Sequence, residues 1–336
     1  MIIIILFLVA FFSTLFITPY AIRYFRFVGI VTTDVHKKGK PLVPHSAGVP
    51  LTVGIMGSLF FYIFLKVFLF KDLSNLIEIF AAASTILIIM FVGFLDDINT
   101  KQMKVKGYIE GKRGLKAWQK PLLTIPAAIP LMAIMAGDTT MNLPLLGTIN
   151  FGILYPLLIV PIGVVGASNM VNMLGGFNGL EAGMGLVYTL SLGIFAYFHG
   201  KTIAAIIFLV TSGALLAILR YNFYPAKILA GDSLTYTLGA VVACGAIIGN
   251  MEKAALITMF PFLAQGALKF YSKFKLGYFA SDLGILRRDG TIKCKYSNIY
   301  SWTHLMMKFN LTEKQIVLVM MIVQIIFAFL PFLLSF

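Results

Sequence analysis

The sequence NMVNMLGGFNGLEAGMG, residues 169–185, lies between two long apolar runs and contains three asparagines and five glycines. Large apolar residues are expected at most positions of a membrane helix, so this stretch marks a break between two such helices. Asn169 and Asn172 are three residues apart and share one helix face, and Gly175 and Gly176 can end that helix. The stretch therefore predicts two apolar helices joined by a polar turn.

The turn has two interpretations. Asn178 and Glu181 have the spacing of a capping box for the second helix, which would make the whole stretch a tight helix–turn–helix. That interpretation leaves Asn169 and Asn172 unexplained in the last turn of an apolar helix. Amide side chains beside bare backbone suit a site for a polar ligand, and the N–H groups that begin the second helix favour an anion.

The chain as a whole is too apolar for a water-soluble protein. Of its 336 residues, 59% are hydrophobic and 12% are charged, whereas the apolar share of a soluble domain is about 45–50%. Apolar runs of about 17–25 residues can cross a bilayer as helices. Ten such runs predict an all-α, multi-pass membrane protein with a single domain over residues 1–336, and we expect the ninth span to bend at Pro261. The predicted spans are 3–22, 46–65, 79–95, 121–137, 151–171, 182–198, 202–219, 233–251, 254–268 and 315–336.

Basic residues collect on one side of the predicted membrane. Ten spans place 23 of the 27 Lys and Arg residues in segments on the same side. The positive-inside rule makes that side cytoplasmic and leaves both termini outside. The net charge of +14 therefore reflects topology first; it can also attract anionic lipid or substrate, while no nucleic-acid-binding module is present. The segments on this side are 23–45, 96–120, 172–181, 220–232 and 269–314.

Four carboxylates lie at the cytoplasmic ends of predicted spans: Asp34, Asp96, Asp97 and Asp232. A carboxylate at the edge of the hydrocarbon needs water, a partner or a cation. A helix cap would explain Asp232 alone, but the adjacent pair Asp96 and Asp97 calls for a compensating cation. Lys120 lies at the same level, either as an interface anchor or as a clamp for phosphate. Carboxylates and amides suit Mg²⁺, with Mn²⁺ as a substitute.

The last cytoplasmic segment, 269–314, is the one sizeable polar excursion that we expect, between the ninth and tenth spans. Within it, LRRDGTIKCKY (286–296) predicts a short hairpin turning at Asp289 and Gly290. We expect this segment to cover a substrate. Cys244 falls in a predicted span and Cys294 in this loop, so no structural disulfide is expected.

These motifs resemble those of the polyprenyl-phosphate N-acetylhexosamine-1-phosphate transferases. The stretch NMVNMLGGFNGLEAG is most similar to the dolichyl-phosphate GlcNAc-1-phosphate transferase branch, and the bacterial phospho-MurNAc-pentapeptide translocase is a more distant relative. DVHKKGKPLVPHSAG (34–48), DDIN (96–99) and GDS (231–233) recur in matching order. The resemblance implies ten membrane helices with the motif-bearing loops on the cytoplasmic face.

The resemblance also implies a reaction, in which a UDP-sugar, UDP-GlcNAc first of all, donates a sugar 1-phosphate to a polyprenyl (dolichyl-type) phosphate and UMP is released. This would be the first membrane step of lipid-linked glycan assembly, as in protein glycosylation. Asn172 and Asp232 would bind Mg²⁺ and Lys120 would hold the diphosphate. The remaining implied positions are Asp96, Asp97 and Asn99 beside the reacting phosphates, Gly176 and Asn178 at the uridine, and Asp34, His45, Asn169, Glu181, Arg287 and Arg288 as further substrate-binding residues.

Several alternatives stay open. Gly175 stands where the bacterial branch has an Asp, which disfavours a peptidoglycan substrate, and His45 stands where the eukaryotic enzyme has a Glu. Another UDP-N-acetylhexosamine donor, a cell-wall polymer pathway and a homodimer all remain compatible with the sequence. A transporter or flippase would place its site at the bilayer midplane between repeated halves. An inert lipid-binding scaffold would have no need of the Asp pair, Asp232 and Lys120 together.

Overall fold

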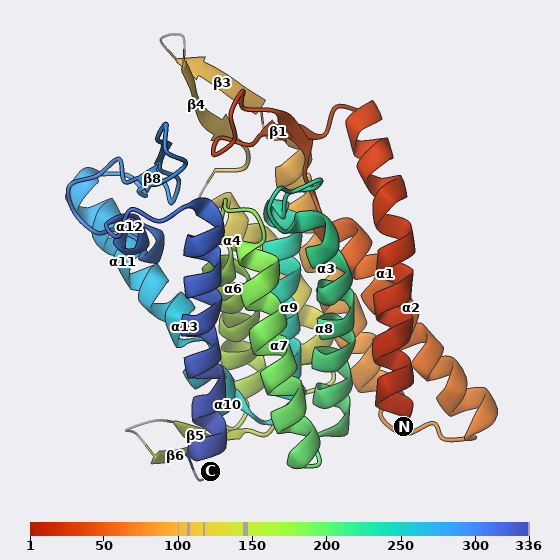
Figure 1. The fold of residues 1–336 in the computed structure, drawn as a ribbon. Coiled ribbons are helices and arrows are strands. Elements are labelled where there is room, and N and C mark those ends of the chain that lie inside the picture. Colours follow the sequence, from red (N-terminus) through yellow and green to blue (C-terminus); the bar gives the residue numbers. More distant parts are fainter. Residues whose placement is uncertain (100, 106–107, 117, 144–146, 335–336) are drawn as a thin grey trace.

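The long helices form one bundle, with both chain termini at its lower end (Figure 1). The computed structural model describes residues 1–99, 101–105, 108–116, 118–143 and 147–334. The longest helices are α1 (Ile2–Phe27), α2 (Gly48–Phe64), α3 (Leu76–Asn99), α7 (Leu180–Phe198), α8 (Thr202–Asn222), α9 (Gly231–Gly249), α11 (Phe260–Leu276) and α13 (Glu313–Leu333).

Seven helices in the described part of the chain are long and apolar enough to cross a membrane. One of them is α2 extended by a π-helical turn, Leu65–Leu69. An eighth results if α10 (Glu252–Thr258) and α11, which meet at an angle of 64°, count as one bent span. The bend comes at Met259, not at Pro261 as predicted, because Pro261 lies in the first turn of α11, where its missing N–H costs no helical hydrogen bond.

The two remaining predicted spans contain prolines: 121–137 is divided into short pieces, whereas 151–171 holds one shorter apolar helix, Tyr155–Val171. The predicted span 121–137 consists of α4 (Gln119–Thr124), a 3₁₀ segment (Ile125–Ala128) and α5 (Ile129–Ala133). The span 151–171 contains a π-helical turn (Tyr155–Ile159) followed by α6 (Val160–Val171). Each piece after a break has a proline in its first turn, where proline is tolerated, whereas it would interrupt a continuous helix. The polytopic helical architecture is confirmed, and the count of ten spans stays a prediction.

Within the described residues, four two-stranded antiparallel sheets accompany the helices. Strands β1, β3, β4 and β8 lie at the upper end of the bundle and β5 and β6 at the lower end (Figure 1). The expectation that 269–314 is the one sizeable polar excursion stays a prediction. The pairs are β1 (Val31–Thr33) with β2 (Leu42–Pro44), β3 (Lys101–Val105) with β4 (Tyr108–Arg113), β5 (Thr140–Leu143) with β6 (Gly147–Asn150), and β7 (Ile285–Leu286) with β8 (Ile292–Lys293).

The hairpin predicted in the last loop is confirmed. Strands β7 and β8 pair antiparallel and turn at Asp289 and Gly290. Gly290 has φ of 87°, a left-handed conformation that glycine adopts without steric cost. Asp289 Oδ1 accepts the Thr291 backbone N–H at 2.9 Å, and this hydrogen bond, with that of the Thr291 hydroxyl, lowers the pKa of Asp289. Local turn chemistry thus shapes this hairpin.

Helix α9 lies at the centre of the bundle and meets its neighbours through glycines. A Cβ added to Gly93 of α3 would lie 2.6 Å from the Asp232 carbonyl oxygen, and one added to Gly48 of α2 would lie 2.2 Å from the Ser233 carbonyl carbon. A Cβ added to Gly239 of α9 would lie 2.4 Å from the Cα of Ser168 in α6. Small residues of this kind let helix backbones approach closely inside a membrane. These contacts hold the first turn of α9 against α2 and α3.

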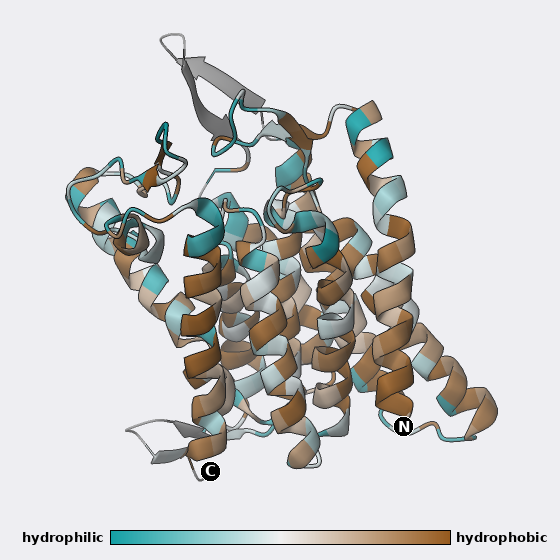
Figure 2. Cartoon of the chain, viewed as in Figure 1, coloured by the Kyte–Doolittle hydropathy of each residue, from teal (hydrophilic) through white to brown (hydrophobic). Residues whose placement is uncertain are grey.

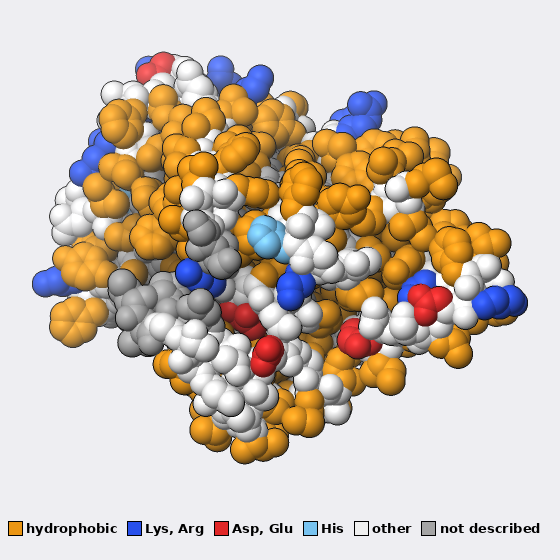
Figure 3. Space-filling model, turned by 90° about the horizontal axis from the view of Figure 1, so that it is seen from below, with side chains coloured by type: hydrophobic (Ala, Val, Ile, Leu, Met, Phe, Trp, Pro, Cys, Tyr) orange, Lys and Arg blue, Asp and Glu red, His pale blue; other side chains and the backbone are white. Residues whose placement is uncertain are grey.

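Polar and charged residues gather at the upper end of the bundle, whereas its middle is hydrophobic (Figure 2). The C-terminal end of α1, the β1–β2 and β7–β8 hairpins and the short helix α12 (Trp302–Met307) lie at this upper end. Seen from below, the opposite end shows a largely hydrophobic rim around a few charged side chains (Figure 3). The segments that carry most of the Lys and Arg therefore share one end of the molecule. The segment 101–117 is also rich in Lys and Arg, but the side chains of 101–113 lie outside the described ones.

The orientation in the membrane can be tested with two serines at opposite ends of the bundle. Ser297, exposed in the last loop, and Ser74, exposed before α3, should each tolerate replacement by Cys in a background lacking Cys244 and Cys294. We expect a membrane-impermeant thiol reagent to label Ser74→Cys in intact cells and Ser297→Cys only in inverted vesicles, because the positive-inside rule predicts that the basic end faces the cytoplasm. Labelling of Ser297→Cys in intact cells would reverse the topology.

Candidate active site

Four of the predicted site residues meet at the upper end of the bundle. Lys120 Nζ, from α4, donates to Asp96 Oδ2 at 2.8 Å and to Asp232 Oδ2 at 2.6 Å. Asn172, which follows α6, donates its side-chain N–H to the same Asp232 oxygen at 3.0 Å. Asp96 comes from the last turn of α3 and Asp232 from the first turn of α9. Packing of four helical segments thus creates this group, called the Lys120 cluster below.

Lys120 keeps its positive charge in this setting. Burial by itself would lower the pKa of Lys120, but the negative charges of Asp232 and Asp96 more than offset it, so that the pKa is raised. An ammonium that holds two carboxylates in a half-buried site is also placed to hold phosphate oxygens. Lys120 is therefore more than a simple interface anchor, since it pairs with two carboxylates; its role as a clamp for phosphate stays a prediction.

Asp97 joins the N-terminus of α9 to the end of α3. Its Oδ1 accepts the backbone N–H of Asp232 at 2.7 Å and its Oδ2 accepts that of Ser233 at 3.1 Å. Gly231 has φ of 71°, and a Cβ there would lie 2.6 Å from Asp97 Oδ2. His45 Nε2 lies 3.2 Å from the Asp97 carbonyl oxygen. With both carboxylate oxygens engaged, Asp97 caps α9 and positions Asp232; a role beside the reacting phosphates stays a prediction.

The capping box predicted for α7 is wrong. The N-cap of α7 is Gly179, with no side-chain hydrogen bond. Glu181 Oε1 instead accepts the backbone N–H of Gly176 at 2.6 Å. A Cβ on Gly175 would lie 2.5 Å from that Glu181 oxygen, so the absence of a side chain at Gly175 leaves room for Glu181. Helix α6 also ends at Val171, before the two glycines that were expected to end it.

Asn178 connects distant parts of the chain. Its side-chain N–H donates to Asp34 Oδ2 at 3.2 Å, and its side-chain oxygen accepts the Ala226 N–H at 2.7 Å. The other amides differ in what they contact: Asn169 Oδ1 accepts the Tyr236 hydroxyl at 3.0 Å, whereas Asn99 is exposed and donates to a carbonyl of its own helix. The face predicted for Asn169 and Asn172 is confirmed, since both contact α9.

Sequence reasoning missed Glu313, the first residue of α13. Its Oε1 accepts the Asn178 backbone N–H at 2.8 Å and its Oε2 accepts Lys37 Nζ at 2.6 Å. Lys37 also lies 3.5 Å from Asp34 Oδ2. His36 lies 3.9 Å from Glu313 and accepts the Gly284 N–H through Nε2. Asp34, His36, Lys37, Asn178 and Glu313 form what we call the Glu313 cluster. The sequence contained a clue to this cluster, because Glu313 is an acidic residue at the end of the last span that borders the basic segment.

The two arginines of the last loop lie on the hairpin. Arg287 donates to Asn310 Oδ1 at 2.6 Å, and Arg288 is exposed. The described residues show no contact of either arginine with the Lys120 cluster. The hairpin is joined to the body by the Ile292 N–H, which donates to the Leu311 carbonyl at 2.9 Å. A role of this hairpin in covering the sugar stays a prediction.

The Lys120 cluster offers oxygen ligands. In the part of the chain that is described, no three His, Cys, Asp or Glu side chains group closely enough to hold a metal by themselves. Two carboxylates share one ammonium, however, and Asn172 adds an amide oxygen, which accepts the Thr235 hydroxyl at 2.7 Å. Mg²⁺ usually takes one or two carboxylates and completes its shell with water and phosphates. The residues present therefore fit Mg²⁺ bound jointly with a phosphorylated substrate.

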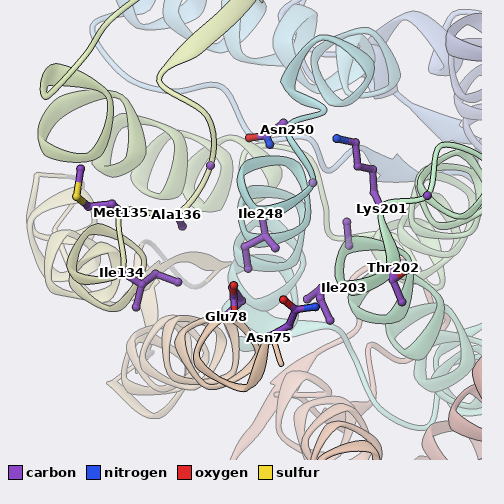
Figure 4. A pocket seen from close by; sticks show the side chains of 14 residues that line it. Asn75, Glu78, Ile134, Met135, Ala136, Lys201, Thr202, Ile203, Ile248 and Asn250 are labelled. Atoms are coloured by element: carbon purple, nitrogen blue, oxygen red, sulfur yellow. The ribbon is translucent and has the colours of Figure 1, made fainter. Parts of the chain in front are cut away.

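A cavity of about 440 Å³ lies at the opposite end of the bundle. Glu78 from the first turn of α3, Lys201 before α8 and Asn250 after α9 line it (Figure 4). None of the predicted site residues lines this cavity. The chemistry expected from the sequence is therefore concentrated at the upper end.

The fold and the site define a polytopic membrane protein whose carboxylates, amides and lysine meet at one end of its helices. The chain belongs to glycosyl transferase family 4, whose sequence profile matches residues 79–250, from α3 to the end of α9. That range contains Asp96, Lys120, Asn172 and Asp232.

Relatives similar to the chain carry transferase names. A Sulfolobus acidocaldarius protein, provisionally named a UDP-N-acetylglucosamine–dolichyl-phosphate N-acetylglucosaminephosphotransferase, is 32% identical over 96% of this chain and 93% of its own length. A Saccharolobus solfataricus protein of the same provisional name is 31% identical over 98% and 95%. A phospho-N-acetylmuramoyl-pentapeptide-transferase of Clostridium perfringens is 31% identical over 72% and 71%. The family resemblance inferred from the motifs is confirmed.

The Glu313 cluster yields a test. Glu313→Gln keeps the shape of the side chain but removes the charge that faces Lys37, so we expect a loss of about 1–3 kcal/mol in unfolding free energy. Thermal unfolding in detergent measures this. Glu78→Gln is the matched control, because Glu78 also lies in the first turn of a spanning helix but has no ion pair among the described residues. Equal melting of the parent and Glu313→Gln would contradict the role given to Glu313.

Proposed function

We propose that the protein transfers GlcNAc-1-phosphate from UDP-GlcNAc to a polyprenyl phosphate of the dolichyl type. An oxygen of the lipid phosphate attacks the sugar-linked phosphorus, the bond from that phosphorus to UMP breaks, and UMP leaves. The products are UMP and a lipid-linked diphosphosugar. The observation that carries this proposal is the Lys120 cluster, in which Asp96, Lys120, Asn172 and Asp232 meet within the region that matches the family.

The residues of the cluster have complementary roles in this reaction. Two phosphorylated substrates repel each other, and Lys120 Nζ, which now contacts two carboxylates, can shift to the diphosphate and reduce that repulsion. Asp97 keeps Asp232 in place through the backbone of α9. The lipid phosphate has a second pKa near 6 and is mostly ionised at neutral pH. The proposed reaction therefore depends more on correct positioning of the two substrates than on a general base.

The proposed metal ion is Mg²⁺, with Mn²⁺ as a substitute. Asp232 and Asn172 would hold it, with Asp96 nearby. When bound, the ion would supply charge stabilisation to the phosphoryl group being transferred. Asp232 is suited to this role because its first-turn position in α9 is held by Asp97 and by the glycine contacts of α2 and α3.

The structure also bears on the donor. The Glu181 side chain fills the space beside Gly175, so a side chain at position 175 would collide with it. An aspartate there, as in the bacterial branch, would also place two carboxylates together. This favours a donor of the UDP-GlcNAc type over the pentapeptide donor of the Clostridium relative. We propose further that the site faces the cytoplasm, because the basic segments share its end of the bundle. Whether the product enters protein glycosylation or another polymer pathway is decided by later enzymes.

The direct test of the function uses the purified full-length protein. It is incubated with dolichyl or undecaprenyl phosphate, Mg²⁺ and one UDP-sugar at a time, and release of UMP is measured. We expect UMP release with UDP-GlcNAc that depends on both the lipid phosphate and Mg²⁺. Turnover with a different UDP-sugar alone would change the donor, and absence of UMP release with every donor would overturn the reaction class.

Asp232→Asn separates a metal ligand from a simple hydrogen-bond acceptor. The helix cap considered for Asp232 is wrong, because Ala230 is the N-cap residue of α9 and Asp97 accepts the first N–H groups of the helix. Asn keeps the shape of the Asp232 side chain but removes the charge proposed to face the metal. We expect the variant to fold like the parent and to lose about a hundredfold or more in transfer rate, with partial recovery at raised Mg²⁺ or with Mn²⁺. Asp138→Asn, at an exposed turn of the lower end, is the control. Parental turnover at ordinary Mg²⁺ would leave Asp232 with only its hydrogen bonds to Lys120 and Asn172.

A further inference from the structure

A groove between α1 and α8 has a basic end and an apolar body. The cavity measures about 350 Å³. Arg23 of α1 and Arg220 of α8 line one end of it, and each lies in the last part of its helix, at the end of the bundle that carries the Lys120 cluster. Both arginines are exposed. The two helices thus bring together two guanidinium groups that are far apart in the sequence.

The two arginines have no acidic partner among the residues that the structure describes; the ion pairs found there involve other side chains. Neighbouring like charges raise each other's free energy unless an anion lies between them. Guanidinium groups bind phosphate through paired N–H donors and do so better than lysine. The basic end of the groove therefore favours a phosphate group as its occupant.

The body of the groove suits a hydrocarbon chain. Leu15, Phe16, Pro19 and Tyr20 of α1 line it below the arginines, and Phe16 is 67% exposed. Of the seven apolar spanning helices described, α1 is the least covered by the rest of the protein, so this groove opens toward lipid. The Tyr221 hydroxyl donates to the Leu15 carbonyl at 3.2 Å, which ties α8 to α1 along the groove.

We propose that this groove binds a membrane phospholipid with a net negative phosphodiester headgroup, phosphate between Arg23 and Arg220 and one chain along Leu15 and Phe16. Basic pockets between membrane helices on the cytoplasmic side are known to take anionic headgroups. The groove belongs to α1 and α8, whereas the Lys120 cluster is built from α3, α4, α6 and α9. The bound lipid is therefore a structural partner and not the acceptor substrate.

Native mass spectrometry of the detergent-purified full chain tests the site without an activity assay. The probes are phosphatidylglycerol and phosphatidylcholine with identical chains. We expect the parent to bind phosphatidylglycerol more tightly and the double variant Arg23→Gln, Arg220→Gln to bind it about tenfold or more weakly. Arg26→Gln is the matched control, because Arg26 is an exposed arginine of the same helix that does not line the groove.

Two further measurements test where the hydrocarbon chain of the phospholipid lies and distinguish the phospholipid from dolichyl phosphate as the occupant of the groove. Phe16→Ala should weaken both phospholipids by a few-fold while keeping the preference for phosphatidylglycerol, because it removes apolar contact only. Excess dolichyl phosphate should leave bound phosphatidylglycerol in place. The proposal is overturned by equal binding of the two phospholipids, by an equal loss in Arg26→Gln, by an unchanged affinity in Phe16→Ala, or by displacement with dolichyl phosphate.

Discussion

The carboxylate of Asp97 and the first turn of α9 form the interaction on which the rest of the site depends. An α-helix begins with backbone N–H groups that have no partner inside the helix, and Asp97, from the end of α3, accepts two of them. Glycines 48 and 93 let the backbones of α2 and α3 approach this turn. Asp232 is thereby held where Lys120 and Asn172 can reach it. A capping contact between two membrane helices sets the geometry of the chemistry.

The Glu313 cluster joins the beginning and the end of the chain next to this site. Lys37 lies in the loop after α1, and Glu313 begins the last helix. The carboxylate of Glu313 pairs with Lys37 and also accepts the backbone N–H of Asn178. Buried charges are tolerated only when they are paired and hydrogen-bonded, and here the pairing spans three loops. The start of the last helix, the loop after α1 and the glycine-rich turn are therefore coupled physically.

The upper end of the molecule combines two kinds of positive charge with different physical roles. Lys120 is half-buried among carboxylates, where charge is strongly felt and suits bound phosphates. Arg23 and Arg220 are exposed, and we propose that they contact a lipid headgroup. The net charge of +14 therefore combines residues with different proposed roles, and its total does not distinguish the proposed reaction from the proposed lipid contact.

The sequence by itself determined the membrane character, most helix positions, the end of the bundle that carries the polar residues and the hairpin at Asp289 and Gly290. These follow from local rules: a spanning segment must satisfy its own backbone hydrogen bonds, and a turn depends on neighbouring residues. Only the tertiary structure decided that Asp97 caps α9, that Glu181 bonds to Gly176 and does not cap α7, and that Glu313 pairs with Lys37. A short polar side chain has several possible partners of similar energy. Packing of helices that are distant in sequence selects among them.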